Sequence, residues 1–210
     1  MVTPESTLRS EPDYAFDFCG GQLAIDFTNT VGSRGAVREE HLRTFGDLLA
    51  WAEARGVLSR GQAQRLRHDA ARRPAAARAA SARALELREA LYRVIETAAA
   101  GRQPAPADLA VVNGHVRETF SRAQLTANRS RLELTMDPTG AASIGGPILT
   151  PVVRAAVELL TSAAIGRVRT CANDSCAWLF LDTTRNRTRR WCDMKVCGNR
   201  SKVRRFREAH

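Results

Sequence analysis

Four of the five cysteines lie near the C-terminus, in two closely spaced pairs. Cys171 and Cys176 are separated by four residues, fifteen residues follow, and Cys192 and Cys197 repeat the four-residue spacing. Each pair can occupy two corners of a tetrahedron, and the segment between the pairs is long enough for the chain to return. Because thiolates hold Zn²⁺ in this geometry and no histidine lies nearby, we expect a closed, structural zinc site with these four ligands.

The alternatives for the cysteines are disulfides, an iron–sulfur cluster or unrelated buried thiols. The N-terminus carries Glu5, Arg9, Glu11 and Asp13 where a secretory signal needs an uninterrupted apolar segment. The longest charge-free stretch, residues 138–153, is too short for a membrane span and contains three prolines and three glycines. We therefore expect a cytoplasmic protein, in which disulfides are disfavoured.

The elements around the cysteines suggest a small treble-clef-like finger. Turn residues between Cys171 and Cys176 predict a metal knuckle, residues 178–181 a strand, and residues 182–190 a basic turn. A helix should begin near Asp193, with Val196, Val203 and Phe206 on the face toward the metal core. Residues 167–210 include too few apolar side chains to fold alone, so we expect the metal to fold them separately from the rest of the chain.

Charge is concentrated in the same segment. Residues 167–210 carry 12 basic and 4 acidic side chains, a net of +8, whereas residues 1–166 carry 20 and 18, a net of +2. A helix with cationic side chains on its outer face is suited to phosphate and base contacts, so we expect DNA as the partner, with RNA as the alternative. The candidate contacts are Arg185, Arg187, Arg189, Arg190, Arg200, Lys202, Arg204, Arg205 and Arg207. Arg200 has a second interpretation, as a structural support of the zinc site.

Helical patterns dominate the chain before the finger. Thr44 and Asp47 predict a capping box, Ser59 an N-cap for a short helix through Leu66, and Pro74 the start of the next helix. The other predicted helices span residues 75–100, 108–123 and 152–165, and residues 131–136 and 142–144 predict a β-hairpin. The periodicity of residues 22–31 fits either a helix or a strand. The predicted fold is mostly α (α+β), with a helical domain at 1–166 and the finger at 167–210.

Chemistry in the helical domain is harder to identify. Asp26, Asn29 and Thr30 lie close together in sequence and suggest either backbone capping or a small ligand pocket. Cys19 is most simply a small buried hydrophobe. The four histidines are scattered, with no carboxylate or cysteine at catalytic spacing, so we do not expect an enzyme.

At two places the chain resembles known bacterial families. Cys197-Gly-Asn-Arg200, preceded by Trp191-Cys192 and the Cys171/Cys176 pair, resembles the CGNR zinc finger. The run Phe18-Cys-Gly-Gly-Gln-Leu-Ala-Ile-Asp-Phe-Thr-Asn-Thr30, followed by Leu48-Leu-Ala-Trp51, resembles the ABATE domain that usually precedes that finger.

The resemblance implies a putative stress-induced transcriptional regulator that binds DNA, with the four C-terminal cysteines as zinc ligands. The helical domain would sense a small-molecule effector or dimerise. The alternatives are an RNA- or ribosome-associated zinc module, or a ligand-binding protein or enzyme whose finger is structural.

Overall fold

Helices dominate the computed structural model, which describes residues 14–121, 123–129, 131–136 and 144–208. In chain order they are α1 (Leu23–Thr28), α2 (Phe45–Ala54), α3 (Arg60–Arg72), α4 (Pro74–Ala99), α5 (Pro106–Phe120), α6 (Gly146–Leu160) and α7 (Asn199–Glu208), with a 3-10 turn η1 (Ala163–Arg167) and a π-helical turn η2 (Met194–Gly198). The described strands pair as antiparallel hairpins: β1 (Val31–Gly32) with β2 (Glu39–Glu40), β3 (Ala123–Asn128) with β4 (Arg131–Met136), and β5 (Val168–Thr170) with β6 (Leu179–Leu181).

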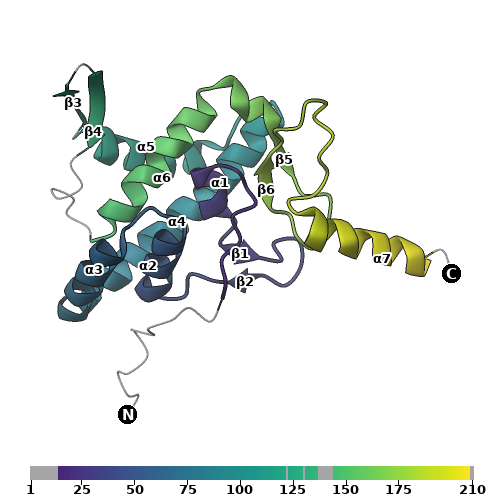
Figure 1. Cartoon of the computed structure of the whole chain (residues 1–210), viewed down its shortest axis with the longest axis horizontal. Helices are drawn as coiled ribbons and strands as arrows, with labels where there is room; N and C mark the ends of the chain where they lie inside the picture. Colours follow the sequence, from purple (N-terminus) through teal and green to yellow (C-terminus); the bar gives the residue numbers. More distant parts are fainter. Residues whose placement is uncertain (1–13, 122, 130, 137–143, 209–210) are drawn as a thin grey trace, which may run out of the picture.

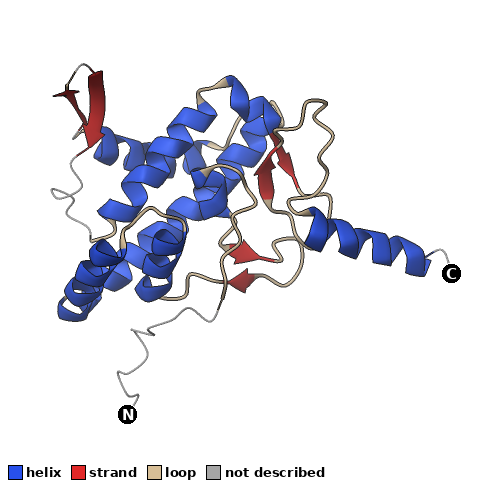
Figure 2. Ribbon diagram, viewed as in Figure 1, coloured by secondary structure: helices blue, strands red, loops and turns tan. Residues whose placement is uncertain are grey.

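Figure 1 shows α1 to α6 in one body, with hairpin β3–β4 and helix α7 projecting at opposite ends, and Figure 2 shows how small the strands are. The expected fold class, mostly helical with a hairpin and a C-terminal finger, is confirmed.

Three predicted helix starts, at Thr44, Ser59 and Pro74, lie where the sequence placed them. The Thr44 hydroxyl accepts a hydrogen bond from the Asp47 N–H, and the Asp47 carboxylate accepts one from the Thr44 N–H, which completes the capping box of α2. Ser59 and Gln62 form the same box at α3, which continues past Leu66 to Arg72. Pro74 opens α4, so local backbone chemistry determined these boundaries.

The ambiguous segment at residues 22–31 is a short helix followed by a strand. The Gln22 side chain accepts hydrogen bonds from the N–H groups of Ala24 and Ile25, which caps α1 at its N-terminus. Both Ile25 and Phe27 are fully buried. Burial on more than one side is why the apolar spacing fitted a helix and a strand equally well.

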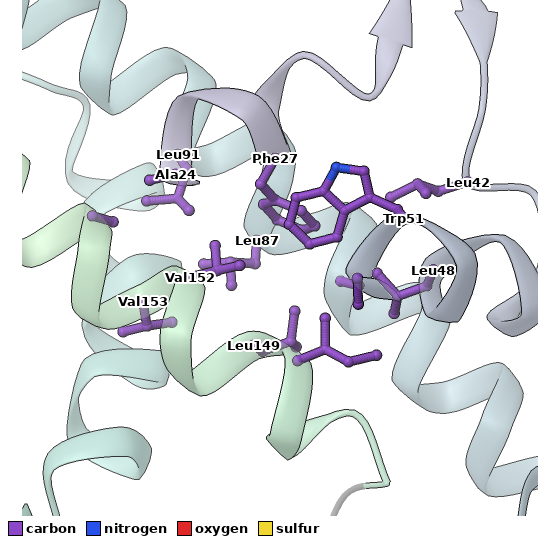
Figure 3. Packing of buried hydrophobic residues seen from close by; sticks show 14 of the residues in the cluster. Ala24, Phe27, Leu42, Leu48, Trp51, Leu87, Leu91, Leu149, Val152 and Val153 are labelled. Atoms are coloured by element: carbon purple, nitrogen blue, oxygen red, sulfur yellow. The ribbon is translucent and has the colours of Figure 1, made fainter. Parts of the chain in front are cut away.

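Helix α4 is the centre of the core. Its residues Leu87 and Leu91 are fully buried, and α1, α2, α5 and α6 all contact it. Figure 3 shows Trp51 of α2 beside Phe27 of α1, with Leu87 and Val152 below them. The two rings are 5.2 Å apart between centroids and tilted by 56°, a favourable aromatic geometry. The core thus joins α1, in the motif of residues 18–30, to the long helix α4.

The structure has a β-hairpin here, but the strand that pairs with residues 131–136 is not the predicted one. β4 occupies residues 131–136 as expected, but it pairs with β3 at Ala123–Asn128 instead of with residues 142–144. The helix expected to reach residue 123 ends at Phe120, which frees β3. Residues 142 and 143 lie outside the described residues, and Ile144 is in a turn. Pro138 and Gly140 are stronger turn signals than Asn128 and Arg129, which is why the sequence pattern favours a hairpin turn after β4 and not before it.

The helix predicted at residues 152–165 is also displaced. α6 begins at Gly146, ends at Leu160, and contains Pro151, the residue directly before the predicted start of this helix. Proline removes one backbone hydrogen bond inside a helix. Burial of Ile148, Leu149, Val152 and Val153 on either side of it offsets that cost.

None of the helices in the described part of the chain combines the length and the apolar character that a bilayer span requires.

Leu87→Ala should lower the free energy of unfolding by about 2–5 kcal/mol, because it opens a cavity in a fully buried site. Chemical denaturation followed by circular dichroism measures this loss. Leu132→Ala is the matched control, since Leu132 is 72% exposed on β4 and should change stability by less than about 0.5 kcal/mol. Equal losses in the two variants would contradict the assigned core.

Candidate metal centre

The structure brings the four C-terminal cysteines together. Their sulfur atoms all lie within 4.8 Å of one another, although the two pairs are fifteen residues apart in the chain. Cys171 follows strand β5 and Cys176 precedes β6, so the first pair occupies the loop of hairpin β5–β6. Cys192 precedes the π-helical turn η2 and Cys197 lies within it.

Local hydrogen bonds shape both cysteine-bearing turns. The Cys171 N–H donates to the Trp178 carbonyl at 2.8 Å, which closes the hairpin, and the Cys176 N–H donates to the Asn173 carbonyl at 2.8 Å. In the second turn, the Asp193 carboxylate accepts from the Val196 N–H at 2.9 Å. Backbone turns of this kind position thiols independently of long-range packing.

The sulfur geometry fits zinc. The Cys192 sulfur lies 3.6 Å from the sulfurs of Cys176 and Cys197. A tetrahedral ion with Zn–S bonds of about 2.3 Å places its ligands about 3.8 Å apart, close to these spacings. The four cysteines would therefore hold Zn²⁺ in a closed structural site, where the metal supplies folding stability.

Proton release should accompany metal binding at this centre. Contacts with Cys171, with Cys176 and then with Cys19 raise the pKa of the Cys192 thiol, and burial adds to that rise. The raised pKa keeps this thiol protonated when no cation is present, and zinc coordination requires the thiolate. Zinc affinity should therefore fall as pH decreases.

The finger is a treble-clef-like arrangement with one difference from the sequence expectation. The strand expected at residues 178–181 is β6, but its partner is β5, which precedes the first cysteine. The segment between the cysteine pairs is a loop after residue 181, held by the buried carboxylate of Asp182. That carboxylate accepts bonds from the Thr184 N–H at 2.9 Å and the Arg189 N–H at 3.1 Å.

The finger is bonded to the helical body along the free edge of β6. Asn29 uses both atoms of its amide on Leu179: Nδ2 donates to the Leu179 carbonyl at 2.8 Å, and Oδ1 accepts from the Leu179 N–H at 3.1 Å. Two residues further on, the Leu181 N–H donates to the Gly20 carbonyl at 2.9 Å. Asn29 and Gly20 therefore bond the edge of β6 that does not pair with β5.

A second line of contacts joins the knuckle to the body. The Trp178 indole N–H donates to the Val31 carbonyl at 2.7 Å, and the Tyr92 hydroxyl donates to the Ala177 carbonyl at 2.8 Å. A Cβ atom on Gly35 would lie 1.7 Å from the Asp174 carbonyl oxygen, so only glycine allows this approach. The sequence contained no signal for these contacts, because the partners are 85 to 147 positions apart.

The residues suggested as a ligand pocket, Asp26, Asn29 and Thr30, are all buried at this junction. Asp26 accepts bonds from the Gly20 N–H at 3.0 Å and from Arg55 Nε at 2.8 Å, and it thereby holds the loop that bonds β6. The Thr30 hydroxyl donates to the Phe27 carbonyl at 2.8 Å. Asn29 bonds the finger directly and Asp26 holds the loop that bonds it, whereas the bonds of Thr30 stay within the helical body.

Burial raises the pKa of Asp26, and the neighbouring Arg55 guanidinium opposes that rise. The residue is 1% exposed, so its hydrogen bonds to Gly20 and Arg55 compensate for desolvation.

Arg189 occupies a structural position. Its guanidinium stacks over the Phe180 ring at 4.5 Å and donates to the carbonyls of Trp191 and Cys192. It also donates to the Cys19 carbonyl at 3.1 Å. These bonds, made by Nε and Nη2 of the guanidinium, clamp the finger to the N-terminal segment.

The other candidate basic residues fall into two sets. Arg185, Arg187 and Arg190 are exposed on the loop after β6, where the Arg190 guanidinium lies 5.4 Å from the centre of the Trp191 ring. Exposed on α7 are Arg200, Lys202, Arg204 and Arg207, and the side chain of Arg205 lies outside the described atoms. Arg204 pairs with Asp174 of the knuckle at 2.9 Å. Within the described residues, no hydrogen bond joins Arg200 to a cysteine, which favours the surface role over support of the thiolates.

The expected packing of α7 is wrong. Val196, Val203 and Phe206 are 45%, 51% and 65% exposed, so this face does not close over the metal core. The core beside the cysteines is already filled by Trp178, Phe180 and Trp191. Helix α7 instead runs outward from the metal turn, as Figure 1 shows.

A cavity of about 330 Å³ adjoins the metal centre at the junction. Its lining includes Cys176, Cys192 and Cys197 of the centre, Arg200 of α7, and Tyr14 of the N-terminal segment. A shallower hollow follows α7. Neither is lined by Asp26, Asn29 or Thr30.

Two family models match the chain. The model ABATE, described as putative stress-induced transcription regulator, matches residues 21–163, and the model described as CGNR zinc finger matches residues 167–210. The first covers more than half of the chain, and the second includes all four clustered cysteines. A search of curated proteins found no match.

Zinc removal should destabilise the whole chain. Trp178 and Phe180 form a separate cluster with the cysteines, but Val168 and Leu179 of hairpin β5–β6 belong to the main hydrophobic core, so unfolding of the finger would also open the core of the body. At a thousandfold excess over Kd, zinc contributes about 4 kcal/mol, or roughly 8–16 °C in Tm for a chain of this length. Thermal unfolding with and without a chelator, followed by circular dichroism, measures the shift, and added zinc but not magnesium should reverse it. Loss of the finger with an unchanged helical transition would support the separate folding expected from sequence.

Asn29→Ala should lower the free energy of unfolding of the zinc-loaded protein by about 2–4 kcal/mol, because it leaves the buried N–H and carbonyl of Leu179 without partners. Denaturant unfolding measures the change. Asn113→Ala, at an exposed site on α5, is the matched control and should cost nothing. A loss in Asn29→Ala no larger than that of an ordinary surface substitution would show that water replaces the amide.

Proposed function

This chain belongs to the ABATE family of putative stress-induced transcription regulators and ends in a CGNR zinc finger, and from that we propose that it binds DNA through helix α7. The observation that carries the proposal is the position of α7, which begins at the metal centre and projects from the body. The zinc cluster would fix the base of this helix. The rest of the helix extends outward, as entry into a groove requires.

The dimensions of α7 suit the major groove. Its 10 residues form a rod about 15 Å long and about 10–12 Å wide. The major groove of B-form DNA is about 12 Å wide and admits one α-helix. The deep, narrow major groove of RNA helices does not, which favours DNA over the RNA alternative.

The charge of the finger supports the same partner. Arg200, Lys202 and Arg207 are exposed on α7, and Arg185 and Arg187 are exposed on the loop after β6 at the same end of the molecule. Such residues neutralise phosphates and release counterions. Arginine can also bond a guanine edge through two hydrogen bonds, which gives sequence discrimination.

We propose that the division at residue 166 is one of function and not of folding. Residues 1–166 hold the finger in one orientation through Asn29, Tyr92 and the carbonyl of Gly20. A signal that changes the body would reach the finger through these bonds. In this proposal the chain is a cytoplasmic regulator and performs no catalysis.

Simultaneous Arg200→Ala, Lys202→Ala and Arg207→Ala should weaken DNA binding at least about tenfold at about 0.1 M salt. Each phosphate contact contributes about −0.9 to the slope of log K against log salt, so the slope should become less negative by up to about 2.7. Binding of genomic fragments by the zinc-loaded protein at several salt concentrations measures both quantities.

The matched control is Arg60→Ala, Arg65→Ala and Arg72→Ala, which removes the same charge from exposed sites on α3. It should leave affinity and slope close to those of the unmodified protein. An equal loss in both triple variants would indicate non-specific charge attraction. Preferential competition by structured RNA over duplex DNA would replace the proposal with the RNA alternative.

A further inference from the structure

We propose that Cys19 and Cys192 form an oxidation site for hydroperoxides, in which a disulfide between them removes one ligand from the metal centre. The inference goes beyond DNA binding and does not depend on it. It starts from the fifth cysteine, whose place in the fold the sequence did not reveal.

Cys19 lies against the metal centre although it is far from the four clustered cysteines in the sequence. It packs with Cys171, Cys192 and Cys197 in one hydrophobic cluster. A single nitrogen of Arg189 donates to the carbonyls of both Cys19 and Cys192. Two carbonyl oxygens that share one donor lie within about 6 Å of each other.

A disulfide requires Cα atoms about 4.4–6.8 Å apart, so only neighbouring cysteines can form one. Cys19 and Cys192 are neighbours, because their carbonyls share the Arg189 donor and their side chains pack in the same cluster. Cys19 is outside the group of four sulfurs that lie within 4.8 Å of one another. Its thiol is therefore a spare one beside a complete ligand set.

The two cysteines differ in access. Cys19 is partly exposed, whereas Cys192 is 2% exposed. Cys19 is also outside the group of four cysteines that would hold the metal. A hydroperoxide would react at this more exposed thiol, and Cys192 would act as the resolving thiolate.

The reaction has two balanced steps. The Cys19 thiol attacks the peroxide, the O–O bond breaks, and the products are Cys19 sulfenic acid and water or an alcohol. The Cys192 thiolate then attacks the sulfenic sulfur, the S–O bond breaks, and hydroxide leaves as the S–S bond forms. The two thiol groups lose two electrons, which the peroxide gains.

Loss of Cys192 as a ligand would leave zinc with three thiolates. The ion would then be held less tightly, so the turn that anchors α7 would loosen. The new bond would join the finger covalently to the N-terminal segment. A thiol reductant together with zinc should restore the original state.

The experiment treats the zinc-loaded full chain with hydrogen peroxide, follows zinc release with a chromogenic chelator, and maps disulfides by mass spectrometry without reduction. We expect a Cys19–Cys192 disulfide to form at the rate of zinc release. Cys19→Ser should bind the same amount of zinc when reduced and should release it at least about tenfold more slowly. Cys19→Ala tests the same loss of sulfur without a hydroxyl group.

Ser33→Ala is the control, because Ser33 lines the cavity beside Cys192 and carries no sulfur. It should release zinc at the rate of the unmodified protein. Disulfides confined to the four ligand cysteines, or equal release rates in Cys19→Ser and the unmodified protein, would overturn the inference. A failure to bind DNA would leave this result unaffected, since neither readout involves DNA.

Discussion

The free edge of strand β6 is the constraint on which the rest of this structure depends. β5 satisfies one edge of a three-residue strand, and the groups on the other edge would be buried without partners. The Asn29 amide bonds both backbone groups of Leu179, and the Gly20 carbonyl accepts from Leu181. Asp26 holds that loop in turn. The motif at the start of the helical body is therefore built around a strand of the finger.

This arrangement explains which features could be predicted from sequence. The capping box at Thr44 and the cysteine pairs are local signals, and both are present where the pattern placed them. The role of Asn29 could not be found this way, because its partner lies 150 positions further along the chain. Asn29 looks the same in sequence whether it caps a helix, lines a pocket or completes a sheet edge.

The errors share a physical cause, which is competition between local signals and burial. Pro151 is a strong boundary signal, yet buried neighbours keep it inside α6. The apolar spacing on α7 predicted a face against the metal, yet aromatic side chains already fill that core. For Arg189, charge alone does not distinguish a clamp from a phosphate contact. Only the bonds from its guanidinium to carbonyls on both sides of the junction separate the two roles.

Because Val168 and Leu179 of the finger pack into the core of the body, metal binding and the conformation of the body are thermodynamically linked. Linkage of this kind is reciprocal: if zinc stabilises the bonds between Asn29 and Leu179, then whatever strengthens those bonds must raise zinc affinity by the same factor. A body joined to its finger only by a flexible linker could not exert such an effect. An effector of the helical domain would therefore need no series of conformational changes between its own site and α7. It would need only to bind with different affinities to the state in which the edge of β6 is bonded and to the state in which it is not.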